Sequence, residues 1–157
     1  MSRPTMRPGT KEKIAPFTED EAIELCEALC LLGYPRQLES AAKAILRHAT
    51  LRQCKAGETV MREGDKACHA YVVRSGWLSV ERRRRHSLRK LSEIMPGGIA
   101  GEMGLLRRGP RTATVRAGVD SELFVIDARE FDLLLGSSPE FRLRMEGLAG
   151  EREMKLS

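Results

Sequence analysis

The sequence has few of the residues that build metal centres or catalytic clusters. It holds three histidines, His48, His69 and His86, and they are scattered along the chain. A metal-dependent enzyme on a β-scaffold needs several histidines and a carboxylate at close spacing. We therefore predict a protein that is not an enzyme, with no catalytic residue, no metal and no cofactor.

Long apolar runs are missing as well. No run approaches the ~18 residues of a membrane span, and residues 1–16 carry basic residues and prolines instead of an apolar secretory segment. The sequence therefore predicts a cytoplasmic protein without a membrane span. With 157 residues, 41% of them hydrophobic, the chain is long enough for one domain with its own core.

The cysteines lack the spacing of a disulfide framework or a zinc site. The four are Cys26, Cys30, Cys54 and Cys68, and no two of them form a Cys-x-x-Cys pair. Cys26 and Cys30 fall one helical turn apart on an apolar stripe. We expect buried, reduced thiols.

Helix signals are present before residue 50. Thr18 to Glu21 has the pattern of a capping box and begins a stretch with a helical apolar period. Gly33 and Pro35 should end this helix, and Gln37–Ala49 predicts a second one. Residues 1–16 ahead of them are expected to form a flexible, basic lead-in.

After residue 50 the pattern changes to short β-type runs broken by glycine. The runs are Glu58–Arg62, Ala70–Arg74, Trp77–Arg82, Arg89–Met95, Thr112–Ala117 and Glu122–Ile126. Many short strands with turn signals between them favour a sandwich or roll. Residues 127–135 then predict a helix, and Ser138 and Pro139 are the N-cap and first residue of a last helix that runs to about Met154.

Residues 101–118, in the middle of the chain, read as a ligand site. Gly101 lets the backbone approach a ligand, and the turn of helix after it offers unpaired N–H groups that attract phosphate. Arg111, held by Pro110, presents a guanidinium fork for two phosphate oxygens. Glu102 accepts but cannot donate a hydrogen bond, so it suits a ligand that carries a hydroxyl beside the phosphate. Together they favour a sugar phosphate.

The same residues carry a family resemblance. Gly101-Glu102-Met103 followed by Arg111-Thr112-Ala113 resembles the phosphate-binding cassette of the cyclic nucleotide-binding domain family, and the resemblance covers about residues 49–155. It implies that these six residues hold the cyclic phosphate and ribose of cyclic AMP or cyclic GMP. The position before the cassette is commonly aromatic in the family and is Ala100 here. Without the resemblance, a solvated turn with a surface ion pair would also fit.

The resemblance implies an α+β fold: an antiparallel, jelly-roll-like β-roll with a one-turn cassette helix, flanked by N-terminal and C-terminal helices. The expected organisation is a lead-in over 1–16, N-terminal helices over 17–50 and the cyclic nucleotide-binding domain over 51–157. In the family the last helix moves over the base when ligand binds. Its candidates for that contact here are Phe141, Met145, Leu148, Arg144 and Arg152; alternatively the apolar ones pack on the roll.

Base preference is weakly encoded. Thr112 is a threonine in family members that respond to cyclic GMP, but also in channels that respond well to cyclic AMP. Ile94 is a candidate apolar wall for the base, although an isoleucine in a strand is more often part of a core.

A second function class rests on the arginine-rich stretch Arg82–Lys90. It could contact a protein, an anionic membrane or nucleic acid independently of any ligand, or it could be a solvated hairpin tip. The leading prediction is a sensor that passes ligand binding to an effector domain or partner protein, with a homodimer possible and nucleic acid an unlikely partner. A DNA-binding transcription factor of the catabolite activator type would have a helix-turn-helix domain after the last helix. The sequence stops at Ser157, so any such domain is either absent or was cut away.

Overall fold

The structure is a computed structural model that describes residues 11–13, 18–29 and 42–156. Its helices are α1 (Glu19–Ala28), α3 (Glu102–Arg107), α4 (Ala128–Ser137) and α5 (Pro139–Lys155). Its strands are β1 (Lys11–Lys13), β2 (Thr50–Cys54), β3 (Thr59–Met61), β4 (His69–Ser75), β5 (Leu78–Arg84), β6 (Ser87–Ile94), β7 (Ile99–Ala100), β8 (Thr114–Ala117) and β9 (Ser121–Asp127).

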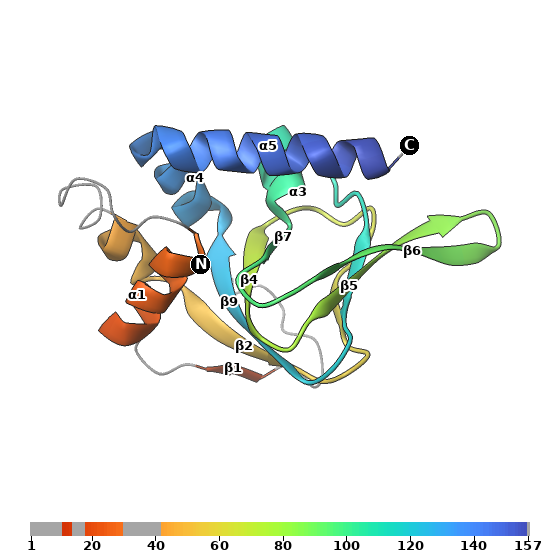
Figure 1. The fold of residues 1–157 in the computed structure, drawn as a ribbon, viewed down its shortest axis with the longest axis horizontal. Helices are drawn as coiled ribbons and strands as arrows, with labels where there is room; N and C mark the ends of the chain where they lie inside the picture. Colours follow the sequence, from red (N-terminus) through yellow and green to blue (C-terminus); the bar gives the residue numbers. More distant parts are fainter. Residues whose placement is uncertain (1–10, 14–17, 30–41, 157) are drawn as a thin grey trace.

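The strands form two antiparallel sheets that face each other as a roll (Figure 1). The first has the order β1-β2-β9-β4-β7, and the second has the order β3-β8-β5-β6. The paired strands of the described residues are antiparallel, including β4 with β9 and β5 with β8. The predicted α+β roll with flanking helices is therefore confirmed.

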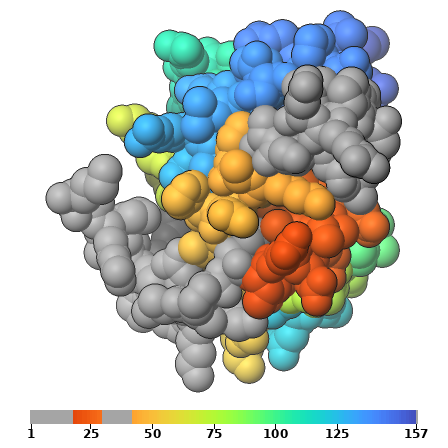
Figure 2. Space-filling view, turned by 90° about the vertical axis from the view of Figure 1, so that its left-hand side faces the viewer, coloured from red at the N-terminus to blue at the C-terminus, as the bar shows by residue number. Residues whose placement is uncertain are grey.

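Strand β4 separates two hydrophobic clusters because successive side chains point to opposite faces of a strand. Tyr71 and Val73 belong to the cluster inside the roll. Ala70 and Val72 belong to a second cluster, which lies between the first sheet and the helices. The second cluster takes in α1, the helical residues 42–46, α4 and α5, which gather on one face in Figure 2.

Two of the helix starts that the sequence predicts are confirmed by their caps. Thr18 and Glu21 form a reciprocal capping box at α1. Ser138 caps α5 by accepting a hydrogen bond from the Phe141 N–H at 3.2 Å, with Pro139 in the first turn. Each cap satisfies N–H groups that a helix start leaves without partners.

Several details differ from the sequence predictions. Strand β1 lies inside the lead-in that we expected to be flexible, and its three residues pair with β2. The sequence Lys-Glu-Lys has no pattern that predicts this tertiary contact. The cassette helix α3 has six residues instead of one turn. Cys26 and Cys54 are buried, but Cys68 is exposed, so the expectation of burial is wrong for this thiol. Gly33, Pro35, Cys30 and residues 37–41 lie outside the described residues.

Candidate functional site

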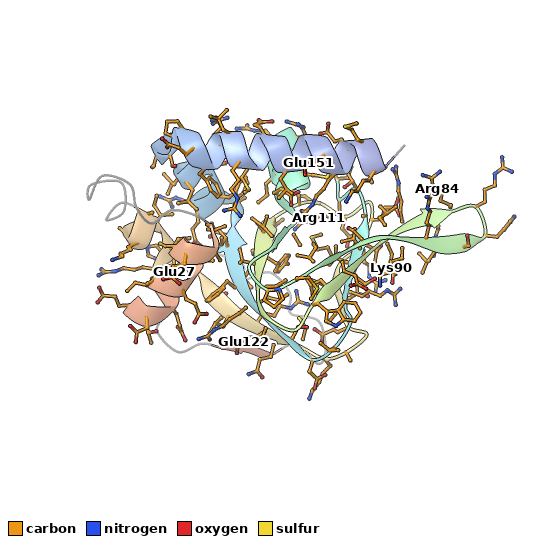
Figure 3. All side chains as sticks on the ribbon, viewed as in Figure 1. Glu27, Arg84, Lys90, Arg111, Glu122 and Glu151 are labelled. Atoms are coloured by element: carbon orange, nitrogen blue, oxygen red, sulfur yellow. The ribbon has the colours of Figure 1, made fainter. Side chains whose placement is uncertain are left out.

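A pocket that opens to solvent lies between the roll, α3 and the C-terminal end of α5; its empty volume of about 550 Å³ includes part of that open solvent. All seven predicted site residues line it: Ile94, Gly101, Glu102, Met103, Arg111, Thr112 and Ala113. The structure thus brings the whole predicted set together around one space, and Figure 3 shows Arg111 beneath α5.

Arg111 is a buried cation at the base of this pocket, with 6% of its surface exposed. Its Nη1 donates to the Gly101 carbonyl at 3.0 Å and its Nη2 to the His69 carbonyl at 2.6 Å. Burial lowers the pKa of the guanidinium. None of the ion pairs found among the described residues involves Arg111. A buried charge bonded only to neutral carbonyls is costly, so this position favours an anionic ligand.

Glu102 is the second buried charge in the pocket, with 1% of its surface exposed. Its Oε2 accepts a hydrogen bond from Arg152 of α5 at 2.6 Å. Its Oε1 is buried and accepts no hydrogen bond from any of the described residues. An unsatisfied buried acceptor costs about 1–3 kcal/mol, so a hydroxyl donor that reached Oε1 would recover this free energy.

Gly101 connects the two charged residues. It has a left-handed backbone (φ 90°), and a Cβ there would lie 2.6 Å from Arg111 Nη1 and 3.0 Å from the His69 carbonyl oxygen. Any side chain at this position would push the guanidinium out of place. The sequence predicted that Gly101 would let the backbone approach a ligand; in this structure the group that lies against Gly101 is Arg111.

The remaining predicted residues form the less polar part of the pocket. Met103, Ala113 and Ile94 are buried, and Thr112 Oγ1 lies 3.7 Å from Met103 Sδ as a weak hydrogen bond. Ile94 also belongs to the cluster inside the roll, so it serves the core and the pocket wall together. One part of the pocket is charged and the other is apolar.

Most of the α5 residues that the sequence suggested for contact with the base do not line the pocket. Phe141 and Met145 are buried in the cluster between the helices and the first sheet, and Leu148 packs against that cluster. They point away from the pocket because α5 passes over the helical layer before it reaches the roll.

The pocket is met farther along α5, by Arg152, Lys155 and Leu156. Arg152 Nη1 donates to the Ile99 carbonyl at 2.7 Å as well as to Glu102. The sequence did not predict Lys155 and Leu156 as pocket residues, because no local pattern shows which turn of a helix lies over a pocket. Arg144, another candidate, donates instead to the Ala28 carbonyl.

The arginine-rich stretch lies in the β5–β6 hairpin, which projects from the body of the molecule (Figures 1 and 3). Arg82 and Arg84 donate to the Leu156 carbonyl at 2.9 and 3.3 Å, and Arg82 also pairs with Glu63. Lys90 lies 5.2 Å from the centre of the Trp77 ring. Part of the arginine-rich stretch therefore makes contacts within the domain itself.

Two properties of the described residues bear on other functions. No group of three or more His, Cys, Asp and Glu side chains in residues 11–13, 18–29 and 42–156 has the proximity to hold a metal ion. Among the helices of this described part, none is both long and apolar enough to cross a membrane.

Comparison with curated proteins finds relatives that carry this segment within longer chains. Human potassium/sodium hyperpolarization-activated cyclic nucleotide-gated channel 3 is 31% identical over 117 residues, which cover 74% of this chain and 15% of the channel. The cAMP-dependent protein kinase regulatory subunit of Blastocladiella emersonii is 34% identical over 95 residues, which cover 60% of this chain and 24% of the subunit. The chain thus spans less than a quarter of these relatives.

Solved structures share the fold at lower identity. A cyclic nucleotide-binding domain from Methylobacillus flagellatus superposes with a TM-score of 0.75 at 16% identity, covering 95% of this chain and 86% of that one. The regulatory subunit of a cAMP-independent protein kinase A from Trypanosoma brucei gives 0.69 at 19% identity, covering 88% and 52%. The family model for the cyclic nucleotide-binding domain matches residues 51–138. The chain therefore belongs to the cyclic nucleotide-binding domain family.

Proposed function

We propose that this domain binds a cyclic nucleotide in the pocket beneath α5. The fold alone cannot carry this proposal, since a regulatory subunit described as cAMP-independent has the same fold. The observation that carries it is the pair of buried charges: among the described residues, Arg111 forms hydrogen bonds to two carbonyls and no ion pair, and Glu102 has one oxygen that accepts no hydrogen bond. Both line one pocket, so a ligand with a phosphate and a hydroxyl satisfies both.

Each part of a cyclic nucleotide then has a counterpart in the pocket. The cyclic phosphate pairs with Arg111, whose guanidinium supplies charge-assisted hydrogen bonds. The ribose hydroxyl donates to Glu102. The base lies against Met103, Ile94 and Ala113, which are buried and apolar. Thr112, whose Oγ1 lies 3.7 Å from Met103 Sδ, is our candidate for a contact that separates guanine from adenine.

Helix α5 supplies the link from binding to signalling. In this structure Arg152 donates to Oε2 of Glu102, so a ribose hydroxyl that donates to Oε1 shares the carboxylate with Arg152 and weakens its hold on the helix. Binding then rearranges the end of α5 and passes the change to a neighbouring effector domain or partner protein. The domain acts in this scheme as a regulator and not as an enzyme.

Titration calorimetry with cyclic AMP and cyclic GMP tests the site. Arg111→Ala should weaken binding of the preferred nucleotide at least about tenfold, because a hydrogen bond to a charged group contributes about 1.5–3 kcal/mol. Glu102→Gln should weaken a ribonucleotide more than its 2′-deoxy analogue. The matched control is Arg129→Ala, at an exposed arginine of α4, which should bind as wild type does.

Two results would contradict the proposal. The first is no heat from either nucleotide at millimolar concentration with a folded wild-type protein. The second is binding that Arg111→Ala leaves unchanged, which would move the site elsewhere. Thermal melting of each variant separates a lost contact from a lost fold.

A further inference from the structure

The tip of the β5–β6 hairpin carries a serine. The turn consists of Arg85 and His86, and Ser87 is the first residue of β6. All three are exposed, and Figure 3 shows the neighbouring Arg84 on the part of the hairpin that projects beyond the roll. Ser87 is not among the described residues that line the pocket. An accessible hydroxyl therefore lies among arginines, away from the candidate nucleotide site.

Two serines of the chain follow a pair of basic residues at the second and third positions before them. Ser87 follows Arg84-Arg85, and Ser92 follows Arg89-Lys90. Kinases distinguish substrates partly by such charge patterns, because carboxylates in a substrate groove pair with arginine and lysine side chains beside the serine. By sequence pattern alone, both serines are therefore candidates for phosphorylation.

The fold holds the strand around Ser87 weakly. A kinase groove takes up an extended segment, so the strand pairing around the serine must first open locally. Strand β8 pairs with β5 only over Leu78–Glu81. From Arg82 to Ser87, β5 and β6 pair with each other and with no further strand of the described residues. A ribbon of two strands is marginally stable, so the tip can open while the roll stays intact.

The conformation of the turn also favours opening. Arg85 has a φ of 41°, which lies in the left-handed region that a residue with a Cβ adopts at an energetic cost. Opening the tip releases this strain. The segment that a kinase would take up therefore includes the most strained residue of the hairpin.

The strand around Ser92 is held by the roll. Ser92 pairs with Val80, and Val80 pairs with Val115 of β8, so this part of the hairpin belongs to the four-stranded sheet. Ser92 is half-buried and lines the pocket, and Ile94 beyond it is buried in the cluster inside the roll. Opening the strand here would expose core side chains. The structure therefore selects Ser87 from the two candidates.

We propose that Ser87 is a phosphorylation site for an ATP-dependent serine kinase with an acidic substrate groove. In the transfer, Ser87 Oγ forms a bond to the γ-phosphorus of ATP while the bond from this phosphorus to the oxygen bridging to the β-phosphorus breaks. ADP leaves with that oxygen, and the hydroxyl proton passes to a base of the kinase. The site lies outside the pocket and holds whether or not the pocket binds a nucleotide.

A phosphate on Ser87 also changes the contact between the hairpin and α5. Arg84 is the cross-strand partner of Ser87, and directly opposite side chains start about 5 Å apart. Arg84 donates to the Leu156 carbonyl at 3.3 Å, but a phosphoserine offers it charge-assisted hydrogen bonds. Arg82, which also pairs with Glu63, keeps its own bond to Leu156. Phosphorylation thus removes one of the two bonds from the hairpin to the end of α5.

Incubation of the full chain with ATP and a purified serine kinase that selects basic residues at these two positions tests the site. Mass spectrometry should place the added phosphate on Ser87 and not on Ser92. A peptide of residues 82–95 carries both serines without the fold and should be modified at both. Modification of the folded chain at Ser92, or no modification under conditions that modify the peptide, would overturn the proposal.

Substitution of the arginines tests recognition. Arg84→Gln and Arg85→Gln should each lower the initial rate of phosphorylation at least about tenfold, because each removes hydrogen bonds between charged groups. Arg129→Gln, at an exposed arginine of α4, should keep the wild-type rate. Equal rates in the three variants would contradict recognition through the hairpin.

Amide hydrogen exchange tests the effect on α5. Exchange in the last turn of α5 should be about two- to tenfold faster in the phosphorylated chain, the range expected for the loss of one hydrogen bond. Unphosphorylated Arg84→Gln loses the same bond to Leu156 and should show the same increase, while exchange in α4 stays unchanged in both. Unchanged exchange in the last turn of the fully phosphorylated chain would overturn the transfer of Arg84 to the phosphate.

Discussion

Glu130 is a buried carboxyl that lies outside the pocket. It has 5% of its surface exposed, and no group of the described residues forms a hydrogen bond with its Oε2. Burial, with a smaller contribution from the neighbouring Asp127 carboxylate, raises the pKa of this carboxyl to about 8. The side chain is therefore protonated in the folded domain at a pH where it is ionised in the unfolded chain.

This difference in proton affinity predicts a pH dependence of stability. Because the folded pKa lies above the unfolded value, the protonated form stabilises the domain fully below about pH 4.5, and that contribution is lost as pH rises through about 8. Glu130→Gln should therefore flatten the fall in unfolding free energy between pH 5 and pH 8, measured by urea denaturation. Glu140→Gln, at an exposed carboxyl of α5, should keep the wild-type slope. An unchanged slope in Glu130→Gln would contradict the assignment.

At the scale of elements, one face of α5 meets different parts of the molecule along its length. Phe141, Met145 and Arg152 all lie toward the domain, yet the first two are buried in the helical cluster and the third reaches the pocket. The helix is the same, but the surface beneath it changes from helices to the roll. Sequence periodicity gives the face of a helix and not the surface that each turn meets, which is why only Arg152 among the five candidates lines the pocket.

The ion pair between Arg152 and Glu102 ties α5 to α3, and removing it should have opposite effects on stability and binding. Arg152→Ala leaves the Glu102 carboxylate buried without its cation, so we expect a loss of about 1–3 kcal/mol in unfolding free energy. Nucleotide affinity should rise, because the ribose hydroxyl no longer shares the Glu102 carboxylate with Arg152. Urea denaturation and calorimetry measure the two effects.

The control for this variant is Arg144→Ala, because Arg144 lies on the same helix and donates to the Ala28 carbonyl away from the pocket. It should change nucleotide affinity little. If Arg152→Ala bound nucleotide more weakly than wild type, Arg152 would be a ligand contact and not a competitor.

At the scale of the whole molecule, the roll and the helical layer share strands. Strand β4 places Val73 in one cluster and Val72 in the other, and β9 does the same with Leu123 and Phe124. Neither cluster can lose its packing without exposing one face of these strands. The two parts are therefore expected to unfold together.

Two spectroscopic signals test this cooperativity. Trp77 is the single tryptophan of the chain and lies in the roll, against Gly118, so its fluorescence reports on the roll. Far-UV circular dichroism reports mainly on the helices. The two urea transitions should coincide, as two-state unfolding requires. Separate midpoints would show that the helical layer unfolds independently of the roll.

The sequence by itself determined what depends on near neighbours in the chain. The caps at Thr18 and Ser138 were predictable because a cap bonds N–H groups two or three residues away. Arg111 and Glu102 could be predicted as site residues because both lie in one short motif.

Only the tertiary structure decided what depends on contacts between distant segments. Three features depend on how one segment packs against another. They are the pairing of Lys11–Lys13 with β2, the exposure of Cys68, and the position of Arg152, Lys155 and Leu156 at the pocket. The contact of Arg152 with Glu102 joins residues that are 50 positions apart. Local sequence patterns do not predict such contacts, because the packing of the whole chain determines which segments meet.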